Sequence, residues 1–415
     1  MATANMPKPA HADADTLLSR KFGKETVNYF SSSPLNRVSF LRSDNLLLSS
    51  ALKHPSTKFL LFNQLAPLSQ TFAQLYYASY QEIEAFVPLN IFDKPEKEII
   101  QTYDSGKAAP LVVFLGLNES QPENGFSYKS YKGNPYFAVD ITPRGALEEK
   151  AKHIIEAAES KGLIFNKARI LTDLPPDDAA IYAQARQIID WNVRNAFCGA
   201  CGHPTISVNA GSKRACPPTD LGLLKNGSST DNCRPPCHTR NTISNLSFPR
   251  TDPTVIVAVV SHDGKKVLLG RQKRYPPCWY STLAGFIEPG ESVEDAVRRE
   301  VWEESGVVVS RVIIHSTQPW PYPASLMIGA IGQTAKPEDE VVNLSHDPEL
   351  EEAQWFDIAE VEEALRTGVS SFGGPKPAGY KEGTLRLAPS TAIAYFLIEA
   401  AAKTELLGNQ YLPRI

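Results

Sequence analysis

The chain has 415 residues, a formal net charge of −4 and six cysteines, and 42% of its residues are hydrophobic. At roughly 150 residues per domain, this length predicts two or three domains that can each bury a core. The slightly acidic balance excludes a broad basic surface for nucleic acid, although it leaves room for a local basic site. No apolar run approaches the ~20 residues of a membrane-spanning helix, and the N-terminus lacks the apolar core of a secretory signal, so we expect a soluble protein.

The first part of the chain predicts a tail followed by an α+β domain. Residues 1–24 are polar and rich in Ala, Pro and Lys, which indicates a flexible tail. In residues 25–172, short apolar runs alternate with loops rich in Pro, Gly, Asn and Ser. The expected elements are strands at Phe59–Phe62, Leu111–Leu115 and Tyr136–Ile141 and a helix at Gly145–Lys161.

A helix and a cysteine-rich segment are predicted in residues 173–249. The helix, Asp173–Asn195, begins with two prolines followed by two aspartates, which suit the first turn of a helix, and its apolar residues recur at helical spacing. Five of the six cysteines then fall between Cys198 and Cys237. Because a chain without an export signal does not need a disulfide framework, this concentration predicts a metal site.

The spacing of the cysteines favours zinc. The pair Cys198 and Cys201 has the two-residue separation that lets both thiolates reach one ion, and no thioredoxin-like context supports the alternative of a redox pair. Cys216 offers a third ligand, whereas Cys233 and Cys237 are both candidates for the fourth. We interpret the remaining candidates as bystanders or packed side chains: His203, His238 and Cys278.

Residues 250–415 predict a further domain of strands and helices. A strand is expected immediately before Gly285, and the segment 216–245 before this domain is expected to be irregular. The other expected elements are strands at Val255–Val260, Lys266–Leu269, Val307–His315 and Ser325–Gln333 and helices at Ser292–Ser305, Ala359–Thr367 and Ser390–Lys403.

The helix at Ser292–Ser305 carries an unusual group of carboxylates. Glu300, Glu303 and Glu304 share the face of the helix that also carries its apolar side chains, and they lie near the C-terminal end, where the helix dipole disfavours anions. Their mutual repulsion would be relieved by a hard cation such as Mg²⁺ or Mn²⁺. The alternative is a solvated acidic face, which the overlap with the apolar stripe disfavours.

This stretch resembles a Nudix box, G-x5-E-x7-R-E-U-x-E-E-x-G-U, within 23 residues. The matching positions are Gly285, Glu291, Arg299, Glu300, Val301, Glu303, Glu304, Gly306 and Val307. The resemblance implies a Nudix fold, a mixed sheet between helices, that hydrolyses nucleoside diphosphates linked to another moiety. It also implies that the glutamates hold divalent metals on the pyrophosphate, where the metals neutralise charge and activate a water.

A second segment narrows the resemblance to the NADH pyrophosphatase family of Nudix hydrolases. The sequence Ser316-Thr-Gln-Pro-Trp-Pro-Tyr-Pro-Ala-Ser325 is similar to the family signature S-Q-P-W-P-F-P-x-S, with Thr317 and Tyr322 as the departures. Because proline lacks a backbone donor, we expect a stiff loop here and no inner strand; packing and a peptide-ligand segment are the alternatives. The resemblance implies that the loop surrounds the dinucleotide through Gln318, Pro319, Trp320, Pro321, Tyr322, Pro323, Ala324 and Ser325.

The resemblance implies roles for further residues. Catalytic roles fall to Arg299 and the metal-binding Glu300, Glu303, Glu304 and Glu349, with the Ala284 carbonyl as a further metal ligand; substrate contacts fall to Phe248, Phe286 and Ala394. A four-cysteine structural zinc ribbon is also implied, and the distance to the following Phe-Pro-Arg favours Cys237 over Cys233. In the N-terminal domain, only two segments resemble the family, and only weakly: Asn36–Arg42 and Tyr136–Thr142.

The sequence therefore predicts an α+β, metal-dependent hydrolase that cleaves NADH, and also NAD⁺, to nicotinamide mononucleotide and AMP. Two alternatives stay open: removal of an NAD cap from RNA, and an inactive zinc-ribbon and Nudix protein that only binds. The family resemblance further implies a homodimer, and the lack of a long apolar run predicts no membrane partner. The C-terminal sequence Leu412-Pro-Arg-Ile415 resembles the peroxisomal signal Ser-Lys-Leu only weakly. Peroxisome and cytoplasm are therefore both expected locations.

Overall fold

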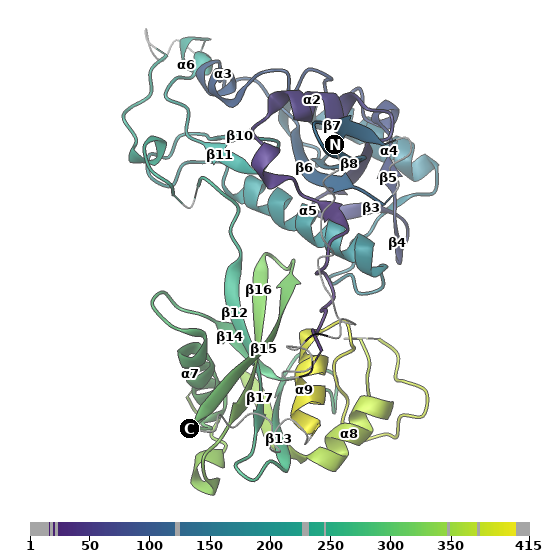
Figure 1. Ribbon diagram of the computed structural model, residues 1–415, viewed down its shortest axis with the longest axis vertical. Helices are drawn as coiled ribbons and strands as arrows, with labels where there is room; N and C mark the ends of the chain where they lie inside the picture. The colour runs from purple at the N-terminus through teal and green to yellow at the C-terminus, as the bar shows by residue number, and fades with distance from the viewer. Residues whose placement is uncertain are drawn as a thin grey trace. The chain divides into compact units, whose positions relative to one another are not determined.

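The computed structural model describes residues 16, 20, 24–120, 125–225, 232–244, 246–346, 349–371 and 374–403. Their contacts divide the chain into two compact units (Figure 1). The described residues of Ser32–Arg250 and Pro321–Ala324 form the first unit, and those of Ala10–Ser31, Thr251–Trp320 and Ser325–Ile415 form the second. No helix in these ranges is long and apolar enough to cross a membrane. Most of the expected tail 1–24 and the whole C-terminal tetrapeptide lie outside the described residues.

The first unit is built on a mixed sheet whose main strand order is β1-β6-β8-β2-β3-β4. Its strands are β1 (Leu35–Asn36), β2 (Lys58–Asn63), β3 (Ala66–Thr71), β4 (Gln74–Leu75), β5 (Tyr77–Ala78), β6 (Leu111–Asn118), β7 (Phe126–Tyr128), β8 (Tyr131–Asp140) and β9 (Ile164–Phe165). Its helices are η1 (Ser39–Leu41), α2 (Asn45–Lys53), η2 (Tyr80–Glu82), α3 (Glu96–Gln101), η3 (Gly145–Leu147), α4 (Glu148–Ser160) and α5 (Pro176–Arg194).

Aromatic and aliphatic side chains of the central strands form the core of this unit. Phe59 of β2 and Phe137 of β8 are partners in a parallel pair, and their stacked rings lie 5.7 Å apart. Helix α5 packs against β6, where Gln184 donates a 2.9 Å hydrogen bond to the carbonyl of Leu115. The predicted strands and both predicted helices of this region are confirmed, because short apolar runs bounded by turn residues and a proline at the start of α5 are strong local signals.

The cysteine-rich segment of the same unit has little regular structure. It contains a short hairpin of β10 (Ile206–Val208) and β11 (Lys213–Ala215), the helix α6 (Leu221–Lys225) and the single turn η4 (His238–Arg240). The rest of the described segment is irregular, as its Ser, Asn, Pro and Gly content predicts.

The second unit is a mixed sheet between helices, with strand order β15-β16-β12-β13-β17 and β14 paired to β12. The strands are β12 (Asp252–Val260), β13 (Lys266–Gln272), β14 (Leu283–Phe286), β15 (Arg311–Trp320), β16 (Ser325–Gln333) and β17 (Leu350–Asp357). The helices are α7 (Val293–Ser305), η5 (Pro337–Glu340), α8 (Ile358–Thr367) and α9 (Ile393–Ala402). Strands β12 and β16 are parallel, whereas the other paired strands of this sheet run antiparallel.

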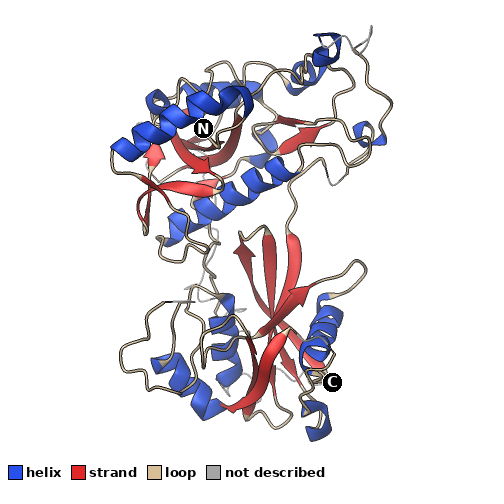
Figure 2. Cartoon of the chain, turned by 180° about the vertical axis from the view of Figure 1, so that it is seen from behind, coloured by secondary structure: helices blue, strands red, loops and turns tan. Residues whose placement is uncertain are grey.

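Both faces of this sheet are buried under helices (Figure 2). Along β12, Val255 and Val257 pack on the side of α7, while Ile256 and Ala258 pack on the side of α9. Such alternation follows from the two-residue period of a strand, and it explains why β12 is apolar at almost every position. The expected fold class, an α+β protein with a mixed Nudix-type sheet, is confirmed.

One expectation about this sheet is wrong. The strand predicted at Val307–His315 begins only at Arg311 and continues to Trp320, so the segment from Ser316 to Trp320 is paired with β16 rather than forming a loop. Pro319 is tolerated there because β15 is the edge strand of the described sheet, where a missing backbone donor faces no partner strand. Only Pro321–Ala324 connects β15 to β16.

Candidate functional site

Helix α7 positions the carboxylates of the Nudix-like box. Its N-cap is Ser292, whose side chain accepts a 3.2 Å hydrogen bond from the amide of Asp295, and Gly306 ends the helix with a left-handed φ of 74°. Ala296, Val297 and Val301 are fully buried against the sheet. This anchored face fixes the rotation of the helix, so the glutamates on the same side are held at defined positions.

The carboxylate of Glu300 lies so close to Gly285 that a larger residue would not fit at position 285. A Cβ at Gly285 would stand 2.0 Å from the Glu300 carboxyl carbon, so any other residue would displace this side chain. The close approach joins two fixed positions of the box that are 15 residues apart in the sequence. It gives the first glycine a steric role that the sequence pattern alone does not reveal.

Arg299 organises the surrounding acidic groups. Its guanidinium donates to Glu291 at 2.6 and 2.8 Å, to Glu300 at 2.8 Å and to Glu303 at 2.9 Å, and it also donates to the carbonyl of Phe286 at 2.8 Å. This network ties the helix to the loop before it. It bridges the carboxylates and supplies the positive charge that keeps them ionised.

Electrostatics distinguish the glutamates from one another. Burial raises the pKa of Glu300, although Arg299 opposes the rise. The hydrogen bond from Arg299 lowers the pKa of Glu291 to about 2, and Glu291 in turn contributes most to raising the pKa of Arg299. Glu304 is only 4% exposed. A partly desolvated carboxylate beside other carboxylates is a site where a bound cation lowers the free energy most.

Glu349, on the turn before β17, belongs to the same region of the second unit. Burial raises the pKa of Tyr275, Arg274 opposes the rise, and the charges of Glu304 and Glu349 add to it. Gln272 donates a 2.6 Å hydrogen bond to Glu349. Sequence reasoning missed Tyr275 and Gln272, because neither lies in a motif and only the pairing of β13 with β17 brings Gln272 to this glutamate.

The donor set of α7 fits a hard divalent cation. Glutamate oxygens are the ligands that Mg²⁺ and Mn²⁺ prefer, and Glu300 and Glu304 are withdrawn from bulk water. In the described part of the chain, no group of three or more carboxylates converges on one point. One guanidinium nitrogen of Arg299 bridges Glu300 and Glu303 and holds these two carboxylates near each other.

The predicted substrate residues of the second unit differ in their exposure. Phe286 is 59% exposed at the end of β14, so its ring is available for stacking. Ala284 is partly buried on the same strand, and Pro319 and Trp320 are partly buried at the end of β15. Ser325 and Ala394 are 5% and 3% exposed, which restricts any ligand contact by either of them.

Gln318 is already engaged within the protein. Its side chain is buried, donates to the carbonyls of Tyr29 and Thr391 at 3.1 and 2.9 Å, and accepts from the amide of Ile393 at 2.9 Å. Both donors and the acceptor oxygen of this amide bond backbone groups in this structure, and the contact of Gln318 with a dinucleotide stays a prediction. Gln318 ties β15 to the start of α9 and to the N-terminal segment of the second unit.

The tip of the Pro/Trp segment belongs to the first unit. Within that unit, the hydroxyl of Tyr322 accepts a 2.7 Å hydrogen bond from the amide of Leu171 and lies 3.3 Å from that of Tyr182, and Arg186 lies over the Tyr322 ring. Of the other residues at this tip, Pro321 and Ala324 are buried and Pro323 is exposed. The remaining predicted substrate contact, Phe248, is 48% exposed. Tyr322 therefore acts as an anchor in this structure.

Four cysteines of the first unit converge. The sulfur atoms of Cys198, Cys201, Cys216 and Cys237 all lie within 4.8 Å of one another, which suits tetrahedral thiolate coordination of zinc. Cys233 is exposed and lies outside this group. The sequence reasoning missed Thr239, whose hydroxyl lies 3.0 Å from the sulfur of Cys237.

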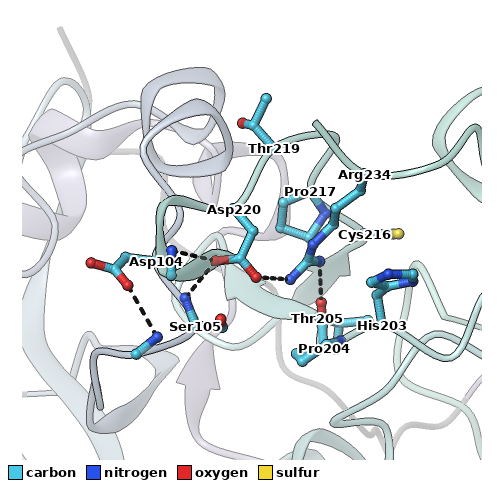
Figure 3. Close-up of polar contacts among 12 residues, drawn as sticks. Asp104, Ser105, His203, Pro204, Thr205, Cys216, Pro217, Thr219, Asp220 and Arg234 are labelled. Atoms are coloured by element: carbon cyan, nitrogen blue, oxygen red, sulfur yellow. Dashed lines mark hydrogen bonds and ion pairs between the residues drawn. The ribbon is translucent and has the colours of Figure 1, made fainter. Parts of the chain in front are cut away.

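A buried ion pair connects the two ends of the chain segment that leads to the fourth cysteine, Cys237 (Figure 3). Arg234 and Asp220 pair at 2.5 Å with side chains that are 0% and 2% exposed. Arg234 also donates to the carbonyl of Pro204 at 2.7 Å, and Asp220 accepts from the amide of Ser105 at 2.8 Å. These bonds hold both ends of the long stretch between the third and fourth cysteines, so Cys237 reaches the cluster despite its distance in sequence.

Comparison with models of protein families identifies three domains in this chain. Residues 250–372 match the model of the NUDIX domain, residues 56–191 that of an NADH pyrophosphatase-like rudimentary NUDIX domain, and residues 194–221 that of the NADH pyrophosphatase zinc ribbon domain. The chain belongs to the NADH pyrophosphatase family of Nudix hydrolases. As a Nudix hydrolase it requires a divalent metal, and its ribbon indicates zinc.

Relatives of this Nudix hydrolase span nearly its whole length. An NAD-capped RNA hydrolase of Schizosaccharomyces pombe is 35% identical, covering 92% of this chain and 94% of the relative. The NAD-capped RNA hydrolase NPY1 of Saccharomyces cerevisiae is 36% identical, covering 90% and 94%. The mitochondrial NAD(P)H pyrophosphatase NUDT13 of Mus musculus is 32% identical, covering 83% and 84%.

Proposed function

We propose that the protein hydrolyses the pyrophosphate bond of NADH and of NAD⁺, giving nicotinamide mononucleotide and AMP. The observation that carries the proposal is the complete carboxylate set of α7, with Glu300 seated against Gly285 in a chain of this family. Glu300, Glu303, Glu304 and Glu349 would hold two or three Mg²⁺ or Mn²⁺ ions, with the Ala284 carbonyl as a further ligand. These ions would supply charge neutralisation at the phosphate oxygens and acidify a water.

The chain's own groups have separate tasks in this proposal. Arg299 orients Glu300 and Glu303 through its hydrogen bonds, and one carboxylate of the site accepts the proton of the attacking water. The exposed ring of Phe286 stacks on a base of the substrate. The four cysteines Cys198, Cys201, Cys216 and Cys237 bind zinc in a structural role, since a ribbon with so small a core needs the metal to fold.

The experiment follows AMP release from NADH in the presence of Mg²⁺ or Mn²⁺. We expect activity from the wild type and a loss of at least about 100-fold in Glu303→Gln. Glu294→Gln, on the first turn of the same helix, is the matched control and is expected to keep its activity. Absence of AMP with any dinucleotide, or full activity in Glu303→Gln, would contradict the proposal and favour the inactive binding protein.

A second candidate substrate is RNA that carries an NAD cap. It is favoured by two relatives named NAD-capped RNA hydrolases, because the sequence similarity extends over more than 90% of each relative and at least 90% of this chain. The bond that breaks is the same pyrophosphate, so the same carboxylates would act. Release of nicotinamide mononucleotide from a capped RNA oligonucleotide tests it directly.

Two further properties belong to the proposal. A homodimer is expected, and light scattering of the purified protein measures its mass. A peroxisomal or cytoplasmic location is expected, and fluorescence microscopy of the full chain with an N-terminal tag distinguishes the two.

A further inference from the structure

Two arginines of the first unit, five residues apart in the chain, have no counter-charge among the described residues. Arg37 and Arg42 flank the turn η1, between β1 and α2. Arg37 is exposed and Arg42 is half-buried, and burial followed by the charge of Arg37 lowers the pKa of Arg42. In the described part of the chain, neither guanidinium group has an ion-pair or hydrogen-bond partner, and the Nε of Arg42 is closed to solvent.

Two carboxylates adjacent to this segment, Asp44 at the start of α2 and Glu119 beside Asn36, are engaged with other side chains. Asp44 accepts hydrogen bonds from the hydroxyl of Tyr128 at 2.8 Å and from Lys129 at 3.0 Å, and it also caps α2. Glu119 accepts a 2.8 Å hydrogen bond from Asn36. Two neighbouring cations without a carboxylate partner repel each other, and an external anion would relieve that repulsion and satisfy the buried Nε of Arg42.

The backbone between the two arginines is strained. Val38 has φ 34° and ψ 46°, a left-handed conformation that is rare for a β-branched side chain, and it is 2% exposed. Its amide donates to the side chain of Asn36 at 3.1 Å, which fixes the bend. Strain of this kind persists where the surrounding structure holds a segment in one shape, and it is frequent at ligand sites.

An exposed aromatic ring completes the surface. Phe40 lies on η1 with 65% of its area exposed, and its ring centre is 5.6 Å from that of Tyr131. Unpaired guanidinium groups beside an exposed aromatic ring match the two components of single-stranded nucleic-acid binding, phosphate attraction and base stacking. An inorganic phosphate would use the arginines but would leave the ring without a role.

We propose that Arg37, Phe40 and Arg42 bind the single-stranded RNA of an NAD-capped transcript, with the arginines on phosphodiester groups and the ring stacked on a base. This proposal deepens the proposed function and rests on its RNA candidate. The overall charge of −4 is compatible with it, since the attraction arises from one local pair of cations. A free dinucleotide ends at the cap and gains nothing from this surface.

The test measures binding of a fluorescent single-stranded RNA with a 5′-monophosphate, which has no pyrophosphate to hydrolyse, to the full chain with its zinc. For the double variant Arg37→Ala/Arg42→Ala we expect affinity to fall at least about tenfold, and the slope of log affinity against log salt to shrink by about 1.4, as two lost phosphate contacts require. Phe40→Ala should weaken binding about fivefold or more without changing the slope, because stacking releases no counterions.

Controls separate a local effect from misfolding and from failure of the enzyme. Arg169→Ala removes an exposed charge of the same unit and should bind RNA as the wild type does. NADH hydrolysis and zinc content should be unchanged in the double variant, and Arg37→Lys/Arg42→Lys should recover most of the salt slope.

Equal RNA affinity in the wild type and the double variant would overturn the proposal. So would an equal loss in Arg169→Ala, or preferential binding of poly-glutamate, which would indicate an acidic protein partner. RNA binding that depends on these residues without removal of the cap would support the surface and refute the RNA candidate for the enzyme. Loss of NADH hydrolysis in the wild type would instead refute the proposed function itself.

Discussion

At the scale of single residues, the contact between Gly285 and Glu300 makes the sharpest prediction. In Gly285→Ala the new Cβ would overlap the Glu300 carboxylate, so the carboxylate must move by about 1 Å or more, and such a displacement can cost about 100-fold in rate. We expect kcat/KM for NADH to fall by about that factor while the melting temperature changes little, because Phe286 next to it is exposed. Unchanged kinetics would show that Glu300 has no fixed position in the working enzyme.

A second residue-scale prediction concerns acid stability. Because Arg299 lowers the pKa of Glu291 from 4.5 to about 2, this pair stabilises the folded state above pH 4.5, and its contribution disappears as the pH falls to about 2. The free energy of unfolding of Glu291→Gln should therefore lie below that of the wild type at neutral pH, and the difference should vanish in acid. Urea unfolding at a series of pH values measures it. A difference that stays constant down to pH 2 would contradict the assignment.

The sequence identifies some of these residues more readily than others. Glu300, Glu303 and Glu304 are recognisable because carboxylates on the apolar face of a helix are locally unfavourable and therefore need a cation. Gln272 and Tyr275 are not recognisable, because their roles arise from pairing between strands distant in sequence. The backbone contacts of Gln318 are not recognisable for the same reason, since their partners come from both ends of the second unit.

At the scale of elements, the end of α7 can be tested with two matched glycines. Gly306 and Gly290 both have positive φ, but a Cβ would lie 2.8 Å from the Cβ of Asn343 at Gly306 and would meet nothing within 4 Å at Gly290. Both alanine variants should lose about 1 kcal/mol from backbone strain, and Gly306→Ala should lose more from the clash. Chemical denaturation compares them. Equal losses would mean that the packing beyond the helix adjusts freely.

The zinc ribbon offers another matched pair, Cys237→Ser and Cys233→Ser. Because only the sulfur of Cys237 converges with the other three, its loss should reduce bound zinc from about one ion per chain to a small fraction, whereas Cys233→Ser should keep the ion. Metal analysis by mass spectrometry measures both. Retention of zinc by Cys237→Ser together with its loss from Cys233→Ser would exchange the two assignments.

Element boundaries show where local patterns stop being informative. The helices α5 and α7 follow their start signals closely, because prolines and capping residues act within one turn. Strand β15 does not, since its prolines argue against a strand and only its place at the sheet edge makes them acceptable. That place depends on the whole topology, which no local pattern contains.

At the scale of the whole molecule, the zinc cluster belongs entirely to the first unit, so zinc removal should affect the two units unequally. After treatment with a strong chelator, we expect the calorimetric transition of the first unit to move to lower temperature. The transition of the second unit should stay where it was. Zinc sites of this kind contribute on the order of 10 kcal/mol to folding, so the shift should be large. A common shift of a single transition would contradict the expected separation.

The membership of Pro321–Ala324 in the first unit has a consequence for dissecting the protein. A fragment beginning at Thr251 would carry this tetrapeptide away from the Leu171 amide and from Arg186. It would also lack Asn28, which donates to Ser316 at 3.0 Å in the second unit. Each unit therefore includes a segment of chain that a cut between residues 250 and 251 would place in the other fragment. A gene split at this boundary should yield two unstable halves, and co-expression of both should be needed to recover either of them in soluble form.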